Sequence, residues 1–307
     1  DALREGLSHD GLTGHSSAVH WVPKTTDPCG RFICDFNSDD VGCSLNSPAL
    51  LDALADRFGE LRLPTLADFV MIFRHVKRSF PNDTILISKV DVKSAFQRVR
   101  LRPEDVAIMA VKLGGELTGR VAINLVGSFG YTGLPYIYGI ITRALRWLHE
   151  EASVRLWGVR LAEVYCDDLV LFSPASLGDA PLQLALDQAR LVGDEAVQLQ
   201  KVESLKRYCD VIGWTFCSDE EVVLPSSRSF LKLFYLFFHA TPTEPKSLPV
   251  RHIQRLQSYT IRYSQAIPAL RPFCHSFAAV LRGARNPRAQ RRVGAAVRAD
   301  VWVWRMV

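Results

Sequence analysis

The chain has 307 residues, 48% of them hydrophobic, which is enough for about two domains with substantial cores. Its formal net charge of +5 permits a polyanionic partner without requiring one. Seven scattered cysteines form no CxxC pair, a pattern that favours a reducing intracellular setting over a disulfide framework. No signal peptide opens the sequence, and Gly, Pro and polar residues interrupt its uncharged stretch at 121–142. We therefore expect no membrane contact and a location in the cytoplasm or nucleus.

Apolar spacing and turn residues predict helices mixed with strands over the first part of the chain. Residues 1–47 are mostly loop, and their best strand candidate is 31–36. The elements expected next are helices at 48–58 and 66–80, a strand ending at Asp91, a hairpin formed by 106–112 and 120–125, and a long helix at 134–151.

The later part of the chain changes character near residue 225, where the apolar spacing becomes helical throughout. This change predicts two domains, 1–224 and 225–307. Because the chain begins and ends abruptly, we also expect it to be a fragment of a longer protein. The elements expected here are a hairpin around Asp167, a helix at 181–193, a strand at 211–216, and helices at 230–238, 249–263, 268–281 and 288–304.

Two adjacent carboxylates, Asp167 and Asp168, lie between short apolar runs that read as two strands joined by a tight turn. Burying two like charges costs free energy unless a cation offsets them. A third acid, Asp91, closes another apolar run, and hard oxygen ligands from two strand ends suit Mg²⁺. The pattern therefore predicts a divalent metal site. A solvent-exposed Asp–Asp turn is the alternative.

The order of motifs resembles that of reverse transcriptases. An Asp at a strand end is followed by a Gly-rich stretch before a helix, the Tyr-x-Asp-Asp hairpin, a Lys and a Gly-Trp strand. The resemblance covers residues 21–216 and implies an α+β right-hand fold, with fingers, an antiparallel palm sheet and a helical thumb-like segment. It is strongest to retrotransposon enzymes, and residues 256–281 are similar to the segment after the palm in tyrosine-recombinase elements.

The resemblance implies that Asp91, Asp167 and Asp168 hold two Mg²⁺ ions, or Mn²⁺ in their place, with the Val92 carbonyl nearby. Phe96, five residues after Asp91, matches the aromatic residue that lies under the nucleotide sugar and excludes a 2′-OH. Packing in the core is the alternative role for this ring.

Three basic residues match positions that contact the phosphates in this family. Lys24 and Arg31 have the spacing of the fingers residues that reach the incoming triphosphate. Lys201 matches the residue that protonates the leaving pyrophosphate, and Lys206 is a nearby competitor for that role. Ordinary surface charge is the alternative for Lys24 and Arg31.

The Gly-rich stretch 127–135 matches the second polymerase motif, in which Gly130 allows close approach of a nucleotide. Phe129 departs from the family, which commonly carries Gln at this position. Gly213 and Trp214 match the primer grip, and an ordinary edge strand is the alternative. Asn46 resembles a loop Asn that follows the fingers strand.

These matches imply an RNA-directed DNA polymerase that uses deoxynucleoside triphosphates and a primer on an RNA or DNA template. One alternative is a degenerate, non-catalytic relic that binds nucleic acid through the Arg-rich last forty residues. A palm-fold nucleotidyl cyclase or nuclease is a second alternative. No HExxH, Gly-x-Ser-x-Gly or Walker A motif offers another chemistry. The oligomeric state and the host are not predicted.

Overall fold

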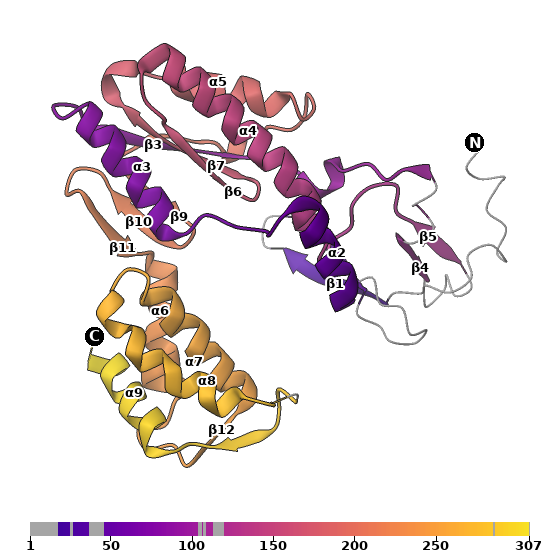
Figure 1. Ribbon diagram of the computed structural model, residues 1–307, viewed down its shortest axis with the longest axis vertical. Helices are drawn as coiled ribbons and strands as arrows, with labels where there is room; N and C mark the ends of the chain where they lie inside the picture. The colour runs from indigo at the N-terminus through magenta and orange to yellow at the C-terminus, as the bar shows by residue number, and fades with distance from the viewer. Residues whose placement is uncertain are drawn as a thin grey trace. The chain divides into compact units, whose positions relative to one another are not determined.

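The computed structural model describes residues 18–24, 27–36, 46–103, 106, 109–112, 120–284 and 286–306. The chain divides into two compact units, one of residues 1–64 and 72–206 and one of residues 65–71 and 207–307 (Figure 1). Among the described residues, no helix combines the length and apolar character needed to cross a membrane. The division into functional domains at residue 224 stays a prediction.

The first unit is built around a four-stranded antiparallel sheet with strand order β6-β7-β3-β8. Its two central strands pair along their full lengths, from Ile85 opposite Pro174 to Asp91 opposite Asp168. This register brings the end of one strand next to the start of the other. The strands are β3 (Ile85–Asp91), β6 (Ala162–Tyr165), β7 (Asp168–Pro174) and β8 (Glu203–Lys206).

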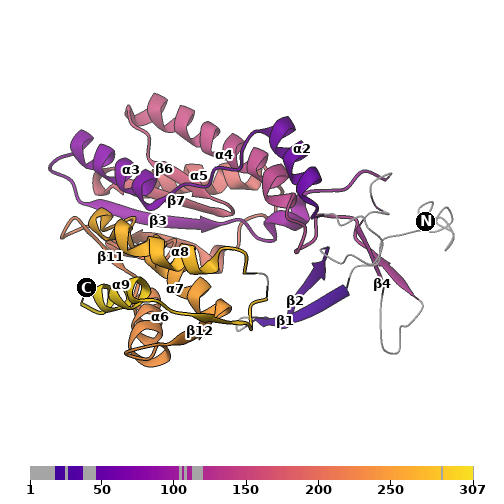
Figure 2. The same ribbon diagram turned by 60° about the horizontal axis from the view of Figure 1, so that its bottom comes forward.

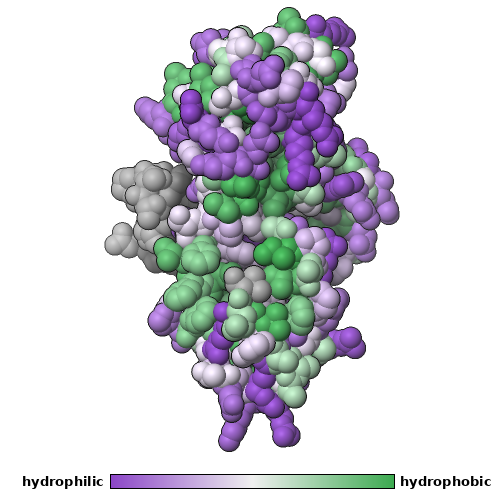
Figure 3. All heavy atoms as spheres, turned by 90° about the vertical axis from the view of Figure 1, so that its left-hand side faces the viewer, coloured by the Kyte–Doolittle hydropathy of each residue, from purple (hydrophilic) through white to green (hydrophobic). Residues whose placement is uncertain are grey.

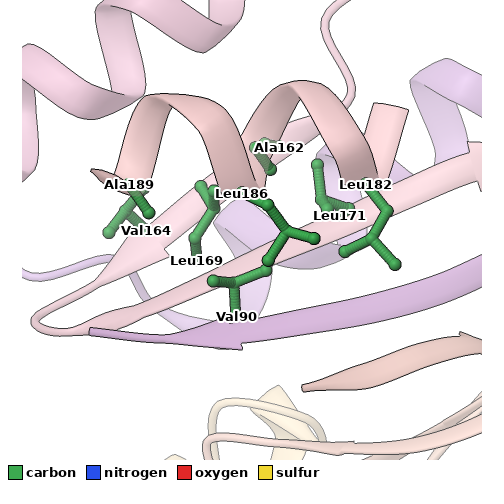
Figure 4. Close-up of a cluster of buried hydrophobic side chains, with 9 residues drawn as sticks. Val90, Ala162, Val164, Leu169, Leu171, Leu182, Leu186 and Ala189 are labelled. Atoms are coloured by element: carbon green, nitrogen blue, oxygen red, sulfur yellow. The ribbon is translucent and has the colours of Figure 1, made fainter. Parts of the chain in front are cut away.

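One face of this sheet is covered by α5 (Ala180–Arg190), with α4 (Leu134–Trp157) beside it (Figures 1 and 2). Side chains alternate along a strand, so Leu169 and Leu171 of β7 both face α5 and pack with its Leu182 (Figure 4). Burying each such leucine stabilises the fold by roughly 1.5–3 kcal/mol. The strand ends that carry the aspartates are therefore supported by a packed hydrophobic core.

The opposite face of the sheet packs against residues 72–79 of α3 (Leu66–Ser79), the part of this helix that belongs to the first unit. Phe172 points to this face, because it alternates with Leu171, and its ring meets that of Phe73 edge-on at 5.7 Å. Ile85 and Ile87 of β3 are completely buried. The sheet is thus covered on both faces, as its run of apolar residues requires.

Helix boundaries follow local capping signals in most places. Helix α2 (Pro48–Phe58) has the predicted bounds, and the Ser47 side chain accepts a hydrogen bond from the Leu50 N–H at 3.3 Å. Helix α4 continues past the predicted end at residue 151 to Trp157, and Gly158 terminates it with φ +74°.

Two antiparallel ribbons complete the first unit. One pairs β1 (Ala18–Lys24) with β2 (Asp27–Asp35), and the other pairs β4 (Ala110–Lys112) with β5 (Val121–Ile123). The second ribbon confirms the predicted pairing but has shorter strands. The predicted turn around Gly114 lies outside the described residues.

In the second unit, the predicted strand at 211–216 is wrong. Residues Ile212 and Gly213 have φ of +44° and +78°, and they form a tight turn between two strands. Two successive residues with positive φ are typical of the hairpin turn whose twist matches its strands. The strands form a meander of β9 (Tyr208–Val211), β10 (Trp214–Cys217) and β11 (Val222–Pro225).

The rest of the second unit is mainly helical, as predicted, except that residues 290–292 pair as a strand within the helix expected at 288–304. Apolar side chains are exposed over this unit (Figure 3), among them Phe230 and Phe238. The elements are α6 (Ser227–Phe234), a π-helix (Tyr235–Ala240), β12 (Ser247–Pro249), α7 (Val250–Tyr263), a 3-10 helix (Pro268–Cys274), α8 (His275–Leu281), β13 (Gln290–Arg292) and α9 (Ala295–Met306).

Candidate active site

Three carboxylates lie at one end of the central strands β3 and β7 of the first unit's sheet, and we call this line of strand ends the aspartate edge. Asp91 is the last residue of β3 and lies opposite Asp168, the first residue of β7. Asp167 precedes it in the turn, and its carbonyl oxygen accepts a hydrogen bond from the Val92 N–H at 2.9 Å. The structure therefore brings together the three aspartates that the sequence singled out. Asp91 precedes Asp167 by 76 residues and Asp168 by 77.

The turn that presents Asp167 has only two residues, because Tyr165 already pairs with Asp168. Cys166 occupies its first position with φ +54°, a conformation that costs a residue with a side chain about 1–2 kcal/mol. The Thr142 hydroxyl of α4 donates a hydrogen bond to the Cys166 carbonyl at 2.9 Å. Helix α4 thus helps to hold the strained turn in place.

The electrostatics of this edge disfavour charged aspartates. Burial raises the pKa of the Asp167 carboxyl above its ordinary value, and the nearby Asp168 and Asp91 raise it further. Burial also raises the pKa of Asp168, while the Lys89 ammonium opposes that shift. A bound cation would relieve this repulsion, so the edge has the electrostatic character of a cation site.

Two lysines stand at the aspartates. The Lys89 ammonium lies 3.0 Å from an Asp168 oxygen, and the Lys201 ammonium lies 3.0 Å from an Asp91 oxygen. Sequence reasoning missed Lys89. The strand periodicity contains the signal, because Lys89 precedes Asp91 by two residues and so shares its face of the sheet.

The donor set fits a divalent metal by its chemistry, since carboxylate oxygens are the ligands that Mg²⁺ and Mn²⁺ prefer. Within the described part of the chain, no group of three His, Cys, Asp or Glu side chains is already gathered as a ligand set. Lysine ammonium groups contact Asp91 and Asp168 instead. A cation at this edge would share the carboxylates of Asp91 and Asp168 with these lysines or displace them.

Lys201 and Lys206 were competing candidates for the same role. Lys201 ends a short 3-10 helix (Leu199–Lys201), and its side chain reaches Asp91. The Lys206 ammonium lies 2.6 Å from a Glu203 oxygen in β8. Lys201 is thus the one of these two lysines whose ammonium lies next to Asp91.

Phe96 lies beside this edge, on a 3-10 helix (Ala95–Arg98) that follows the first motif. Its half-buried ring is 5.5 Å from the ring of Phe129 and 5.8 Å from that of Tyr138. Among the described residues the buried Tyr138 hydroxyl has no hydrogen-bond partner, and burial, with Asp167 nearby, raises its pKa. Val92 places its side chain in the adjoining core.

A cavity of about 50 Å³ opens next to Phe96. Part of its wall is Cys166 of the aspartate turn, and three arginines from the 61–64 segment and α4 also line it: Arg62, Arg143 and Arg146. A ring at this place borders free space on one side and core aromatics on the other. That position is compatible with both roles considered for Phe96.

Gly130 owes its conformation to a contact within the first unit. Its φ is +105°, and a Cβ atom there would overlap the carbonyl oxygen of Cys34 in β2. The Phe129 carbonyl accepts from the Cys34 N–H at 2.9 Å. The Asn46 amide donates to the Gly130 carbonyl and accepts from the Thr132 N–H, both at 2.8 Å. Asn46 therefore fixes the Gly-rich loop, a role that sequence reasoning did not assign.

Replacing Gly130 with Ala is expected to destabilise the protein by at least about 2 kcal/mol, because left-handed strain and a backbone overlap add together. Gly158 is a matched control, since it is left-handed with φ +74° and ψ +7° but nothing lies within 4 Å of a Cβ atom there. Gly158→Ala should cost only about 1–2 kcal/mol. Urea unfolding measures both variants, and equal losses would contradict the role of the Cys34 contact.

Lys24 and Arg31 lie on the first ribbon, where Lys24 pairs with Asp27 and Arg31 with Val22. Only their backbone is described, so the predicted triphosphate contacts lie outside the described side chains. Gly213 and Trp214 belong to the second unit. Gly213 is in the β9–β10 turn, and the buried Trp214 ring lies 5.3 Å from that of Tyr263.

Comparison with known proteins found no matching family model and no matching curated protein sequence. Solved structures do match. A foamy viral protease-reverse transcriptase in complex with an RNA/DNA hybrid gives a TM-score of 0.55 at 12% identity, over 94% of this chain and 33% of that one. The same kind of protein in complex with double-stranded DNA gives 0.55 at 13% identity, over 94% of this chain and 43% of that one.

The likeness at this low identity confirms the coarse prediction of a reverse-transcriptase-like fold with mixed helices and antiparallel sheets. The chain spans less than half the length of these neighbours. No sequence comparison supports the narrower prediction of a retrotransposon or tyrosine-recombinase type.

Proposed function

We propose that the chain is the polymerase part of an RNA-directed DNA polymerase of a retroelement. The observation that carries this proposal is the meeting of Asp91, Asp167 and Asp168 at one edge of an antiparallel sheet. Two solved structures with a similar fold are of foamy viral protease-reverse transcriptase, bound to an RNA/DNA hybrid in one and to double-stranded DNA in the other, which supports the same choice.

In the proposed reaction, a primer 3′-OH on an RNA or DNA template attacks the α-phosphate of a deoxynucleoside triphosphate, and pyrophosphate leaves. Asp91, Asp167 and Asp168 would hold two Mg²⁺ ions, which supply charge stabilisation at the reacting phosphate. The chain's own residues position the reactants. Lys201, next to Asp91, would donate a proton to the leaving pyrophosphate.

The remaining assignments follow the same scheme. Lys24 and Arg31 would bind the triphosphate, Phe96 would border its sugar, and Gly213 with Trp214 would direct the primer terminus. Residues 1–224 would then form the fingers and palm, and residues 225–307 a thumb. A retroelement polymerase of this kind would act in the cytoplasm or nucleus.

The test is primer extension on an RNA template with Mg²⁺, with the wild type compared with Asp167→Asn. We expect template-dependent extension by the wild type only. If the wild type extends no better than the variant, the proposal is wrong. Salt-dependent nucleic-acid binding that survives Asp91→Ala, with no extension under Mg²⁺ or Mn²⁺, would instead identify a non-catalytic relic.

The products of the same assay distinguish a polymerase from a palm-fold nuclease or nucleotidyl cyclase. A polymerase lengthens the labelled primer one nucleotide at a time. A nuclease would shorten either strand, and a cyclase would convert the free triphosphate to a cyclic nucleotide without any primer. Either of those products in place of longer primers would overturn the assignment.

A further inference from the structure

The turn between β9 and β10 is strained. Ile212 has φ +44°, and this region is unfavourable for a β-branched side chain. Gly213 follows with φ +78°. Such conformations persist only where surrounding contacts hold them.

The contact that holds this turn comes from α7 of the same unit. The Arg262 guanidinium donates a hydrogen bond to the Ile212 carbonyl oxygen. A Cβ atom at Gly213 would overlap that guanidinium, which is the flexible end of its side chain and can shift, so glycine is needed here chiefly for its φ. The Gly213 carbonyl accepts a hydrogen bond from the Ser226 N–H at 3.2 Å, just before α6.

The next residue of α7 contacts the hairpin as well. The Tyr263 ring lies 5.3 Å from the ring of Trp214, and both side chains are buried. Two consecutive residues of α7 therefore contact the turn and the strand after it. Arg262 binds the Ile212 carbonyl oxygen, and Tyr263 packs on the Trp214 ring. Hydrogen bonds from a charged donor are about twice as strong as neutral ones, which suits Arg262 to opposing the strain.

We propose that Arg262 is a positioning residue that sets the conformation of the Ile212–Gly213 turn, and through it the alignment of a primer terminus. The second half of this inference rests on the proposed function, in which Gly213 and Trp214 direct the primer. The first half concerns the fold of the second unit alone and is measurable without any activity.

Hydrogen–deuterium exchange of the full chain tests the first half. Arg262→Met keeps an apolar stem but removes the donor, and Arg251→Met is the control, because Arg251 is an exposed residue of the same helix. We expect exchange at residues 212–214 to rise about tenfold or more in Arg262→Met, which corresponds to about 1.4 kcal/mol. Exchange in β3 and in the control should match the wild type.

Arg262→Lys guards against a general loss of folding, since it retains a charged donor and should restore part of the protection. Unchanged exchange at residues 212–214 in Arg262→Met would overturn the proposal. A rise spread evenly over the whole second unit in both variants would also overturn it, because that result describes a stability residue without a specific role at the turn.

Primer extension tests the second half. For Arg262→Met we expect the rate at saturating deoxynucleotide to fall about tenfold with an unchanged apparent affinity for the nucleotide, and Arg262→Lys should recover part of the rate. A lower nucleotide affinity with an unchanged rate would contradict a role in primer alignment. If the wild type shows no extension, the proposed function fails, whereas the exchange experiment still decides the role of Arg262 at the turn.

Discussion

Asp167→Asn is expected to slow nucleotide addition by about 10²–10³-fold or more, the range measured when one group that stabilises a transition state is removed. The same substitution should raise the melting temperature at neutral pH. The two effects have one cause, because Asp167 is a half-buried carboxylate next to Asp168 and Asp91. A residue kept only for packing would not show this opposition of activity and stability.

The pH dependence of this stability gain follows from the direction of the pKa shift. The pKa of Asp167 is raised above its ordinary 3.8 in the folded protein. The folded state therefore holds the proton more tightly than the unfolded state, and stability is lost as pH rises through the folded pKa. Asp167→Asn removes that loss, so its advantage should be full at pH 7.5 and should shrink as pH falls toward 3.8.

Calorimetric melting at several pH values measures this trend, with Asp194→Asn as a control because Asp194 is exposed. Mg²⁺ or Mn²⁺ should raise the melting temperature of the wild type and the control more than that of Asp167→Asn, since a ligand that binds the folded state stabilises it. An Asp167→Asn protein that melts lower than the wild type at pH 7.5 would contradict the repulsion at this edge.

Phe96→Val is expected to lower discrimination against ribonucleotides by roughly 10²-fold, a difference of about 2.8 kcal/mol at 1.4 kcal/mol per tenfold. The Phe96 ring lies on the cavity that Cys166 also borders, so a smaller side chain enlarges the space on that side. Use of deoxynucleotides should change little. Incorporation of matched ribonucleotides and deoxynucleotides by both proteins measures the ratio.

Phe73→Val is the matched control, because it truncates a buried aromatic ring against Phe172 on the sheet face away from α5 and leaves the Phe96 ring in place. The control should lose stability without losing discrimination. If Phe96→Val also discriminates like the wild type, then Phe96 belongs to the core with Tyr138, and the match of the first motif to the family shifts with it.

Structural features that depend on a few neighbouring residues, such as helix starts and tight turns, were predictable from the sequence. Helix α2 starts and ends as predicted, because Ser47 and Pro48 form a local start signal. The hairpin around Asp167 followed from two apolar runs and a two-residue turn. The turn at Ile212 was missed because no local signal marks it. The apolar run 211–216 is continuous in the sequence, and only the backbone conformation shows the break.

The sequence by itself determined the three aspartates and the antiparallel strands that carry them, because strand periodicity and turn length act over short distances. Only the tertiary structure decided which distant residues contact the aspartates and the Gly-rich loop. Lys201 contacts Asp91 across 110 residues, and Asn46 contacts Gly130 across 84. Such contacts depend on how the sheet, helices and ribbons pack together, and no local pattern of apolar and polar residues encodes that packing.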